Sequence, residues 1–369
     1  ITHLEKHIMR YPQFFATKAI EKHLDAENKN GIIWHTQGSG KTALTYFNVK
    51  YLTDYYQKKG IIAKFYFIVD RLDLLNQATS EFRSRGLNVE EVSSKDDFIK
   101  NISSVTSTEN TGKATITVVN IQKFSTESVA KNSDYAIDVQ RVYFMDEAHR
   151  SYNPTGSFLG NLIESDRNAV KIALTGTPLI GVVYDEYGRP VGGKKYDSKQ
   201  IFGDYIHKYY YNASIADGYT LKLIREGIAT TYRERLQSAL AEIKTLQGSI
   251  QKKEMYAHPK YVSELVNYIA NDFETSRIAM NDDSVGGMIV CDSSEQAKMV
   301  FEELNKTQFS SALILHDVDD KETRKGYISD FKKGTIDFLV VYNMLLTGFD
   351  APRLKKLYLG RVIKDHSLL

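Results

Sequence analysis

The segment Ile32–Thr42 constrains the fold more than any other part of this chain. An apolar run ends in a Gly-Ser-Gly turn, a Lys-Thr pair follows, and the apolar residues after it have helical spacing. This order predicts a strand, a phosphate-binding loop and a helix. Gly38, Ser39 and Gly40 form the turn, and the glycines let backbone N–H groups approach a polyphosphate that a Cβ would block.

Two residues after the turn supply the side chains of the predicted site. We expect the Lys41 ammonium to reach the β- and γ-phosphates of a nucleotide, and the Thr42 hydroxyl to hold Mg²⁺. His35 stands where the full GxxxxGK[ST] pattern has a glycine. The alternative is a turn that only joins two elements, and the motifs downstream make that alternative the weaker one.

Composition bounds the class of protein. The 369 residues are 42% hydrophobic and 25% charged, as in soluble globular proteins, and no apolar run approaches the roughly 18 residues of a membrane span. The single cysteine, Cys291, excludes an internal disulfide and fits a reducing cytoplasm. The net charge of +2 means that any nucleic-acid contact uses a local groove. Because the chain opens on Ile1 without Met or a signal peptide, we expect a fragment.

Two polar residues upstream of the loop are candidates for nucleotide contact. Arg10 and Gln13 lie just before the predicted helical stretch 14–24, and a glutamine amide offers both a donor and an acceptor to adenine. An ordinary helix start explains the same residues equally well.

Polar residues also follow two predicted strands of the first half. Arg71 comes just after the strand 63–69, and Asn120 and Gln122 come just after the strand 114–119. Ligand sites in α/β sheets lie at the carboxyl ends of strands, so these three residues are candidates for ligand contact. A solvated loop arginine is the alternative for Arg71.

A carboxylate pair follows the predicted strand 141–145. Asp146 and Glu147 are costly to bury unless they serve a cation or a proton transfer. We predict that Asp146 binds Mg²⁺, directly or through water, and that Glu147 orients or deprotonates the attacking water. His149 would connect this nucleotide site to the next motif. A solvated helix start is the alternative.

A short turn follows the predicted strand 169–174. It contains Thr175, Gly176 and Thr177, whose small size allows tight packing against the Asp-Glu-Ala-His turn. We expect these residues to couple the nucleotide site to the rest of the protein. A simple strand-ending turn remains the alternative.

The order of strands and motifs predicts two α/β lobes. One nucleotide-binding parallel sheet covered by helices would occupy 1–205. Alternation of strand and helix begins afresh in 206–369, which predicts a second lobe, with further strands at 207–211 and 222–231. The charged helical run at about 232–256 is expected to be a solvent-facing insertion.

Three residues that follow the predicted strand 336–341 are further candidates for the nucleotide site. Gly348 permits a tight turn, Thr347 can contact a phosphate, and Asp350 can contact a nucleotide ribose or a facing arginine.

Together these motifs look like a superfamily 2 helicase-type motor, and they most resemble the motor (R) subunit of type I restriction-modification enzymes. His35 in place of the first loop glycine is typical of that family. The matching stretches are Trp34–Thr42, Val69–Leu72, Asn120–Phe124, Met145–Ser151, Leu174–Pro178 and Asn343–Pro352.

The resemblance implies an α/β fold of two RecA-like P-loop domains, each a mainly parallel sheet flanked by helices. It implies an ATP-driven translocase of double-stranded DNA that uses ATP and Mg²⁺. The implied setting is a cytoplasmic complex with modification (methyltransferase) and specificity subunits, away from any membrane.

The resemblance also implies a nuclease domain before Ile1, and two arginine fingers in a final motif beyond Leu369. We therefore expect the chain as given to bind ATP, to hydrolyse it poorly and to cleave no DNA. Arg353 and Arg361 are the nearest candidates for the finger role within the chain.

Three alternative functions remain. An RNA helicase also carries Asp-Glu-Ala-His, but Thr175-Gly176-Thr177 differs from the Ser-Ala-Thr that such enzymes resemble there. A chromatin-type DNA remodeller is closer in mechanism, with a phosphate loop that reads differently. A scaffold that binds ATP without turnover has no need of the Glu147 carboxylate.

Overall fold

The computed structural model of the chain describes residues 7–69, 72–92, 94–103, 114–120, 139–147, 166–179, 183–184, 190–192, 197–220, 222, 224–247, 252–345, 349 and 351–360. The chain divides into two compact units, Ile1–Leu223 and Ile224–Leu369. Each unit is a mixed α/β structure built on its own parallel sheet.

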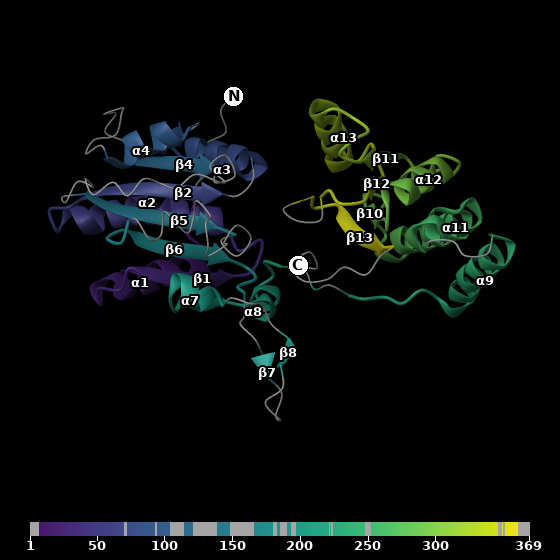
Figure 1. Ribbon diagram of the computed structural model, residues 1–369, viewed down its shortest axis with the longest axis horizontal. Coiled ribbons are helices and arrows are strands. Elements are labelled where there is room, and N and C mark those ends of the chain that lie inside the picture. Colours follow the sequence, from purple (N-terminus) through teal and green to yellow (C-terminus); the bar gives the residue numbers. More distant parts are fainter. Residues whose placement is uncertain are drawn as a thin grey trace. The chain divides into compact units, whose positions relative to one another are not determined.

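The first unit contains a seven-stranded sheet in which all described neighbours run parallel. In spatial order the strands are β3 (Asn88–Val92), β4 (Thr115–Asn120), β2 (Ile62–Val69), β5 (Val139–Asp146), β6 (Val170–Thr175), β1 (Asn30–His35) and β9 (Tyr205–Tyr209) (Figure 1). Because the strands are parallel, all their carboxyl ends lie on one edge of the sheet, where α/β proteins place their sites.

Both faces of this sheet are buried, as a parallel sheet requires. Along β2, Phe65 and Phe67 enter one hydrophobic cluster while Tyr66 and Ile68 enter the cluster on the opposite face. The helices that contribute to the first cluster are α1 (Tyr11–Asp25), α2 (Lys41–Gln57) and α3 (Leu72–Ser84). Those that contribute to the second are α4 (Lys95–Ser103) and α7 (Ser198–Phe202). The described residues of this unit also include the short helix α8 (Tyr211–Ala216) and the antiparallel pair β7 (Val183–Tyr184) and β8 (Pro190–Gly192).

The second unit contains a four-stranded parallel sheet. Its spatial order is β11 (Ser311–Ile314), β12 (Phe338–Val341), β10 (Gly286–Val290) and β13 (Leu354–Leu359). The helices are α9 (Thr230–Gln247), α10 (Lys252–Ala257), α11 (Pro259–Met280), α12 (Ser294–Leu304) and α13 (Lys321–Lys333) (Figure 1). Buried residues of β10 alternate between two clusters, so this sheet is covered on both faces as well.

The two lobes expected from the sequence are present, but the division between them lies later in the chain. The structure divides the chain after Leu223, whereas the sequence placed the division at 205/206. The reason is β9, which pairs in parallel with β1 through Trp34 and Lys208, among others, and so belongs to the first sheet. Sequence alternation locates a strand but does not say which sheet it joins.

Two expectations for the start of the second unit differ from the structure. Residues 222 and 224–229 form no strand, and Ile224 is 77% exposed, so the β-branched residues there have no partner strand within the described residues. The expected insertion at about 232–256 is α9 and α10, and α9 is not solely solvent-facing. Leu236 and Ile243 are buried, and Leu236 joins the core formed with α11.

In the described part of the chain, every helix is too short or too polar to span a lipid bilayer.

Candidate nucleotide-binding site

The turn between β1 and α2 is shaped by two glycines in the left-handed backbone region. Gly38 has φ +76° and Gly40 has φ +81°, conformations that favour glycine. A Cβ on Gly40 would also lie 2.5 Å from Gln13 Nε2. The helix begins directly after this turn, and Leu44 N donates to Gly40 O at 2.9 Å. The result is the strand, glycine turn and helix start that a phosphate-binding loop needs.

Neighbouring strands hold the turn from both sides. Thr36 N donates to Tyr209 O of β9, and Trp34 Nε1 donates to Gly176 O after β6, each at 3.0 Å. A Cβ on Gly176 would lie 3.3 Å from His35 O. Gly176 therefore packs on the start of the phosphate loop. The packing expected against the Asp-Glu-Ala-His turn stays a prediction, because Ala148 and His149 lie outside the described residues.

Lys41 and Glu147 meet at the carboxyl edge of the sheet. Lys41 Nζ lies 3.6 Å from Glu147 Oε1, and their side chains are 10% and 14% exposed. Lys41 Nζ also donates to His35 O at 3.5 Å. The fold thus brings together a cation and a carboxylate from two motifs that are far apart in the sequence.

The backbone at Glu147 is strained. Glu147 has φ +49°, a region that costs a non-glycine residue about 1–2 kcal/mol. Its backbone N–H donates to Leu174 O of β6 at 2.9 Å, which holds the conformation in place. Strain of this kind clusters at functional sites because surrounding structure must over-determine it.

The oxygen donors present fit a magnesium ion that is shared with a nucleotide. Thr42 lies in the first turn of α2, and Asp146 is the last residue of β5. Among the described residues, no group of three or more His, Cys, Asp or Glu could hold a metal by itself. Mg²⁺ normally keeps several waters and takes one or two protein oxygens together with substrate phosphates, so this donor set suffices only with nucleotide bound.

Arg10 and Gln13 contact the loop directly. Gln13 Nε2 donates to Gly40 O at 3.1 Å, while Gln13 Oε1 accepts from Arg10 N at 3.0 Å. Gln13 is only 3% exposed. In this conformation the amide nitrogen of Gln13 supports the loop and its amide oxygen caps the start of α1, and the contact of Gln13 with adenine stays a prediction.

A buried histidine pair that the sequence did not reveal lies under the loop. His35 Nε2 and His207 Nδ1 are 2.7 Å apart, and His35 is fully buried. Burial, followed by the charges of His207 and Lys41, lowers the pKa of His35 to about 3, and burial also lowers the pKa of His207. Both imidazoles are therefore neutral near pH 7, so one ring donates the hydrogen bond and the other accepts it.

The remaining predicted residues divide into two groups. Asn120 ends β4 and is 3% exposed, so a DNA contact by its side chain requires the strand exit to open. Six others lie outside the described residues: Arg71, Gln122, His149, Thr347, Gly348 and Asp350.

Arg353 is excluded as an arginine finger by its contacts. Its side chain donates to Ser284 O at 2.8 Å and to Phe331 O at 2.7 Å, and it is 9% exposed. It joins loops within the second unit and has no free guanidinium to offer a nucleotide. Arg361, the other candidate, lies outside the described residues.

Sequence reasoning also missed a segment beside the loop. Tyr11 and Tyr209 both donate a hydroxyl hydrogen bond to Asp217. Thr220 Oγ1 donates to Gln37 O at 3.5 Å, and Arg10 Cζ lies 4.6 Å from the centre of the Tyr219 ring. Asp217, Tyr219 and Thr220 follow β9, in a stretch that we expected in the second lobe from the sequence. No sequence motif marks these three residues.

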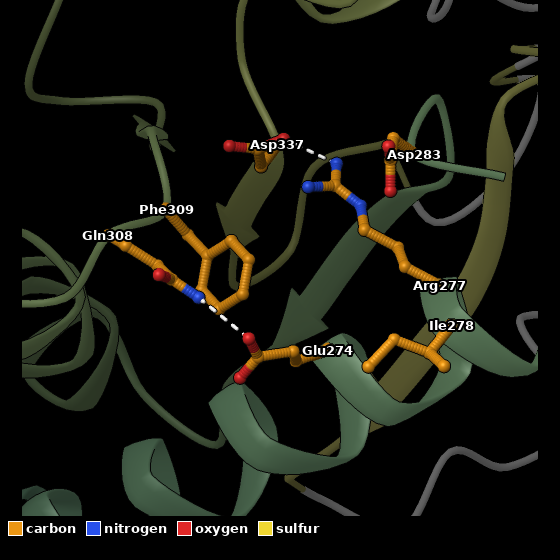
Figure 2. A pocket seen from close by; sticks show the side chains of 7 residues that line it. All are labelled: Glu274, Arg277, Ile278, Asp283, Gln308, Phe309 and Asp337. Atoms are coloured by element: carbon orange, nitrogen blue, oxygen red, sulfur yellow. Dashed lines mark hydrogen bonds and ion pairs between the residues drawn. The ribbon is translucent and has the colours of Figure 1, made fainter. Parts of the chain in front are cut away.

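The second unit carries a separate open pocket of about 300 Å³ that contains none of the predicted site residues. Figure 2 shows Arg277 directed at Asp337 and Gln308 directed at Glu274, pairs that lie 2.5 and 3.3 Å apart. Asp337 precedes β12, so this pocket lies at the amino end of that strand. Its lining residues are Glu274, Arg277, Ile278, Asp283, Gln308, Phe309 and Asp337.

Comparisons with known proteins match both units. Residues 12–256 match the SWI2/SNF2 ATPase family model, and residues 229–369 match the model for type I restriction enzyme subunit R domain 3. The type I restriction enzyme SauCOLORF180P endonuclease subunit of Staphylococcus aureus strain COL is 26% identical over 98% of this chain. The SsaAORF53P endonuclease subunit of Staphylococcus saprophyticus is 27% identical over the same share. The chain spans 41% of the length of each relative.

A solved structure supports the fold. The ATP-dependent type ISP restriction-modification enzyme LlaBIII bound to DNA superposes with a TM-score of 0.64 over 96% of this chain and 26% of its own, at 14% identity. The two parallel sheets are therefore the two RecA-like domains expected from the sequence. With a family model that matches more than half of its residues, the chain belongs to the SWI2/SNF2 ATPase family, and within it resembles the R subunits of type I restriction enzymes.

Proposed function

We propose that this chain is the ATP-driven, double-stranded DNA translocase of a type I restriction endonuclease. The observation that carries the proposal is the approach of Lys41 Nζ to Glu147 Oε1, 3.6 Å apart, beside a glycine turn at the carboxyl edge of a parallel sheet. A phosphate-binding cation and a candidate base for water therefore share one site.

The site residues have separable roles in this proposal. Gly38, Ser39 and Gly40 present backbone N–H groups to the phosphates, and Lys41 turns from Glu147 to the β- and γ-phosphates when nucleotide enters. The freed Glu147 carboxylate then orients and deprotonates the attacking water.

Thr42 and Asp146 would hold Mg²⁺, which neutralises charge on the β- and γ-phosphates when it is bound. Thr175, Gly176 and Thr177, with His149, would couple hydrolysis to movement. Gly348 and Asp350 are the further residues that we assign to nucleotide contact.

DNA as the substrate rests on the relatives. The curated relatives are endonuclease subunits of type I restriction enzymes, and the similar solved structure is bound to DNA. Arg71, Asn120, Gln122 and Thr347 are the residues we assign to DNA contact. Contacts of this kind go mainly to the phosphate backbone, which suits a motor that tracks any sequence.

The intact enzyme would include more than this chain. We propose that modification and specificity subunits choose the DNA site in the cytoplasm, and that a nuclease domain elsewhere in the R subunit cuts after translocation. The relatives are more than twice the length of the matched region, which leaves room for such a domain.

The decisive measurement is nucleic-acid specificity of ATP turnover. We would measure it on the intact subunit that contains this chain, with duplex DNA, single-stranded DNA or RNA. We expect duplex DNA to stimulate turnover most. Stimulation by RNA alone would favour an RNA helicase, and ATP binding without turnover under all three conditions would favour a nucleotide-binding scaffold.

A further inference from the structure

An aromatic side chain with an arginine beside it borders the phosphate loop. Tyr219 is 37% exposed, and Arg10 Cζ lies 4.6 Å from the centre of its ring. Arg10 Nη1 also donates to Gly38 O at 3.4 Å, so the pair adjoins the glycine turn. A planar guanidinium over an aromatic face forms a cation–π contact and leaves flat surfaces on which a further ring can stack.

The fold fixes Tyr219 beside the loop although it lies far away in the sequence. Tyr219 N donates to Ser214 O at 2.9 Å, and the next residue, Thr220, donates to Gln37 O of the loop. Two residues earlier, Asp217 accepts hydroxyl hydrogen bonds from Tyr11 of α1 and Tyr209 of β9. These hydrogen bonds anchor the backbone around Tyr219. Because the residue is already held in place, it loses little conformational freedom when a ligand packs on its ring.

The amide predicted to read the base is already occupied. Gln13 donates to Gly40 O and accepts from Arg10 N, and it is 3% exposed. Reading a base edge would cost these hydrogen bonds, of which one holds the loop at Gly40 and the other caps the start of α1. Recognition through a ring face has no such cost, because Tyr219 and Arg10 present planar surfaces outside the loop.

We propose that Tyr219 and Arg10 form the stacking platform for the purine base of the nucleotide. The inference rests on the proposed function and adds to it the group that holds the base, separate from the groups that hold the phosphates. Each purine has a π-face, so this platform provides affinity with little selection between bases.

The test separates base from phosphate. Isothermal titration would compare Mg²⁺–ATP with Mg²⁺–tripolyphosphate, which carries the phosphates without a base, on the chain as given. Stacking of a base on an aromatic residue corresponds to about 5- to 150-fold in affinity when the aromatic is replaced by alanine. We therefore expect Tyr219→Ala to weaken ATP binding by about that factor and to leave tripolyphosphate binding unchanged, while Tyr219→Phe binds ATP like the wild type.

A matched control is available in the same unit. Tyr55 also lies under a cation, with Lys59 Nζ 3.9 Å from its ring centre, but it is near the far end of α2 from the loop. Tyr55→Ala should leave both affinities unchanged. Equal ATP affinity in Tyr219→Ala and wild type would overturn the platform, and so would equal loss of ATP and tripolyphosphate binding. A wild-type chain that binds neither ligand would instead overturn the proposed nucleotide function.

Discussion

Two carboxylate–cation pairs lie near opposite ends of β5, and they differ in geometry and in burial. Near the start of the strand, Arg141 meets Asp166 with Nε–Oδ2 and Nη2–Oδ1 distances of 2.5 and 3.1 Å, and these side chains are 3% and 1% exposed. After its end, Glu147 meets Lys41 through one contact of 3.6 Å, with 14% and 10% exposure. We call the buried, bidentate Arg141–Asp166 pair the tight pair and the single-contact Lys41–Glu147 pair the loose pair.

The tight pair has further partners. Tyr143 donates its hydroxyl to Asp166 Oδ2 at 3.0 Å, and Lys171 Nζ donates to Asp166 O at 2.6 Å. Burial, together with the Asp166 charge, raises the pKa of Tyr143, which keeps the hydroxyl protonated as a donor. This network joins β5, β6 and the segment before β6 in the core.

The difference in burial and geometry between the two pairs suggests different roles: the tight pair stabilises the fold, and the loose pair serves ATP turnover. A buried, bidentate pair resists exchange because removal of either partner leaves an uncompensated charge in the interior. A single contact at the sheet edge exchanges more easily, so an incoming phosphate can take the lysine and leave the carboxylate for water. On this view, loss of the loose pair impairs turnover, and loss of the tight pair impairs folding.

The largest effect is expected from Lys41→Ala. Without the ammonium at the β- and γ-phosphates, ATP turnover should be abolished and ATP binding weakened. Turnover would be followed with duplex DNA present, in the intact subunit, and binding by titration of this chain. Wild-type turnover in the variant would show that the loop is not the phosphate site.

The next effect tests the tight pair. Asp166→Ala leaves Arg141 buried without its carboxylate, and we expect the first unit to lose about 3–5 kcal/mol in free energy of unfolding. Trp34 is the only tryptophan of the chain and lies on β1, so its fluorescence in a denaturant titration reports on the first unit. Glu147→Gln is the control and should leave this unfolding curve unchanged. Equal destabilisation by both variants would remove the distinction between the pairs.

The loose pair is tested by activity. Glu147→Gln keeps the shape of the side chain and removes the carboxylate that handles water. We expect ATP binding to persist and the hydrolysis rate to fall at least about 10²-fold, the scale of general-base removal. Normal ATP hydrolysis by Glu147→Gln in the intact subunit would mean that another residue activates the water.

Local order along the chain let the sequence predict most of this arrangement. The glycine turn, the strand that ends in Asp146 and Glu147, and the parallel sheet all follow from motif and periodicity. The proximity of the glycine turn to Asp146 and Glu147 could be predicted because parallel strands bring their carboxyl ends to one edge of the sheet. The occupation of the Gln13 amide could not, because it depends on which neighbours fill its hydrogen bonds.

Residues joined only by tertiary pairing escaped prediction. His207 and Tyr219 reach the loop because β9 pairs with β1, and nothing in the residues of β9 specifies that neighbour. The face of α9 was misjudged for a related reason. Its buried stripe is Leu236, Ala239 and Ile243, and an alanine at the centre of the stripe gives a weak apolar signal.

The smallest effect concerns the histidine pair beneath the loop, and its sign follows from proton binding. The pKa of His35 is lowered to about 3 in the folded chain, whereas a histidine in an unfolded chain titrates near 6.5. Between these values the unfolded state binds more protons, so stability is complete above about pH 6.5 and declines as the pH falls toward 3. At pH 5.5 the loss from this residue should be about 1 kcal/mol.

The measurement is denaturant unfolding followed by Trp34 fluorescence at pH 7.5 and 5.5, for wild type and His207→Asn. Asparagine keeps a hydrogen-bonding group near His35 Nε2 but removes one of the two imidazoles whose pKa burial lowers. The variant should therefore lose less stability than wild type between the two pH values. An equal loss would mean that His207 accepts a proton in the folded chain as readily as in the unfolded one. The stability of the first unit would then not depend on keeping both imidazoles neutral beneath the loop.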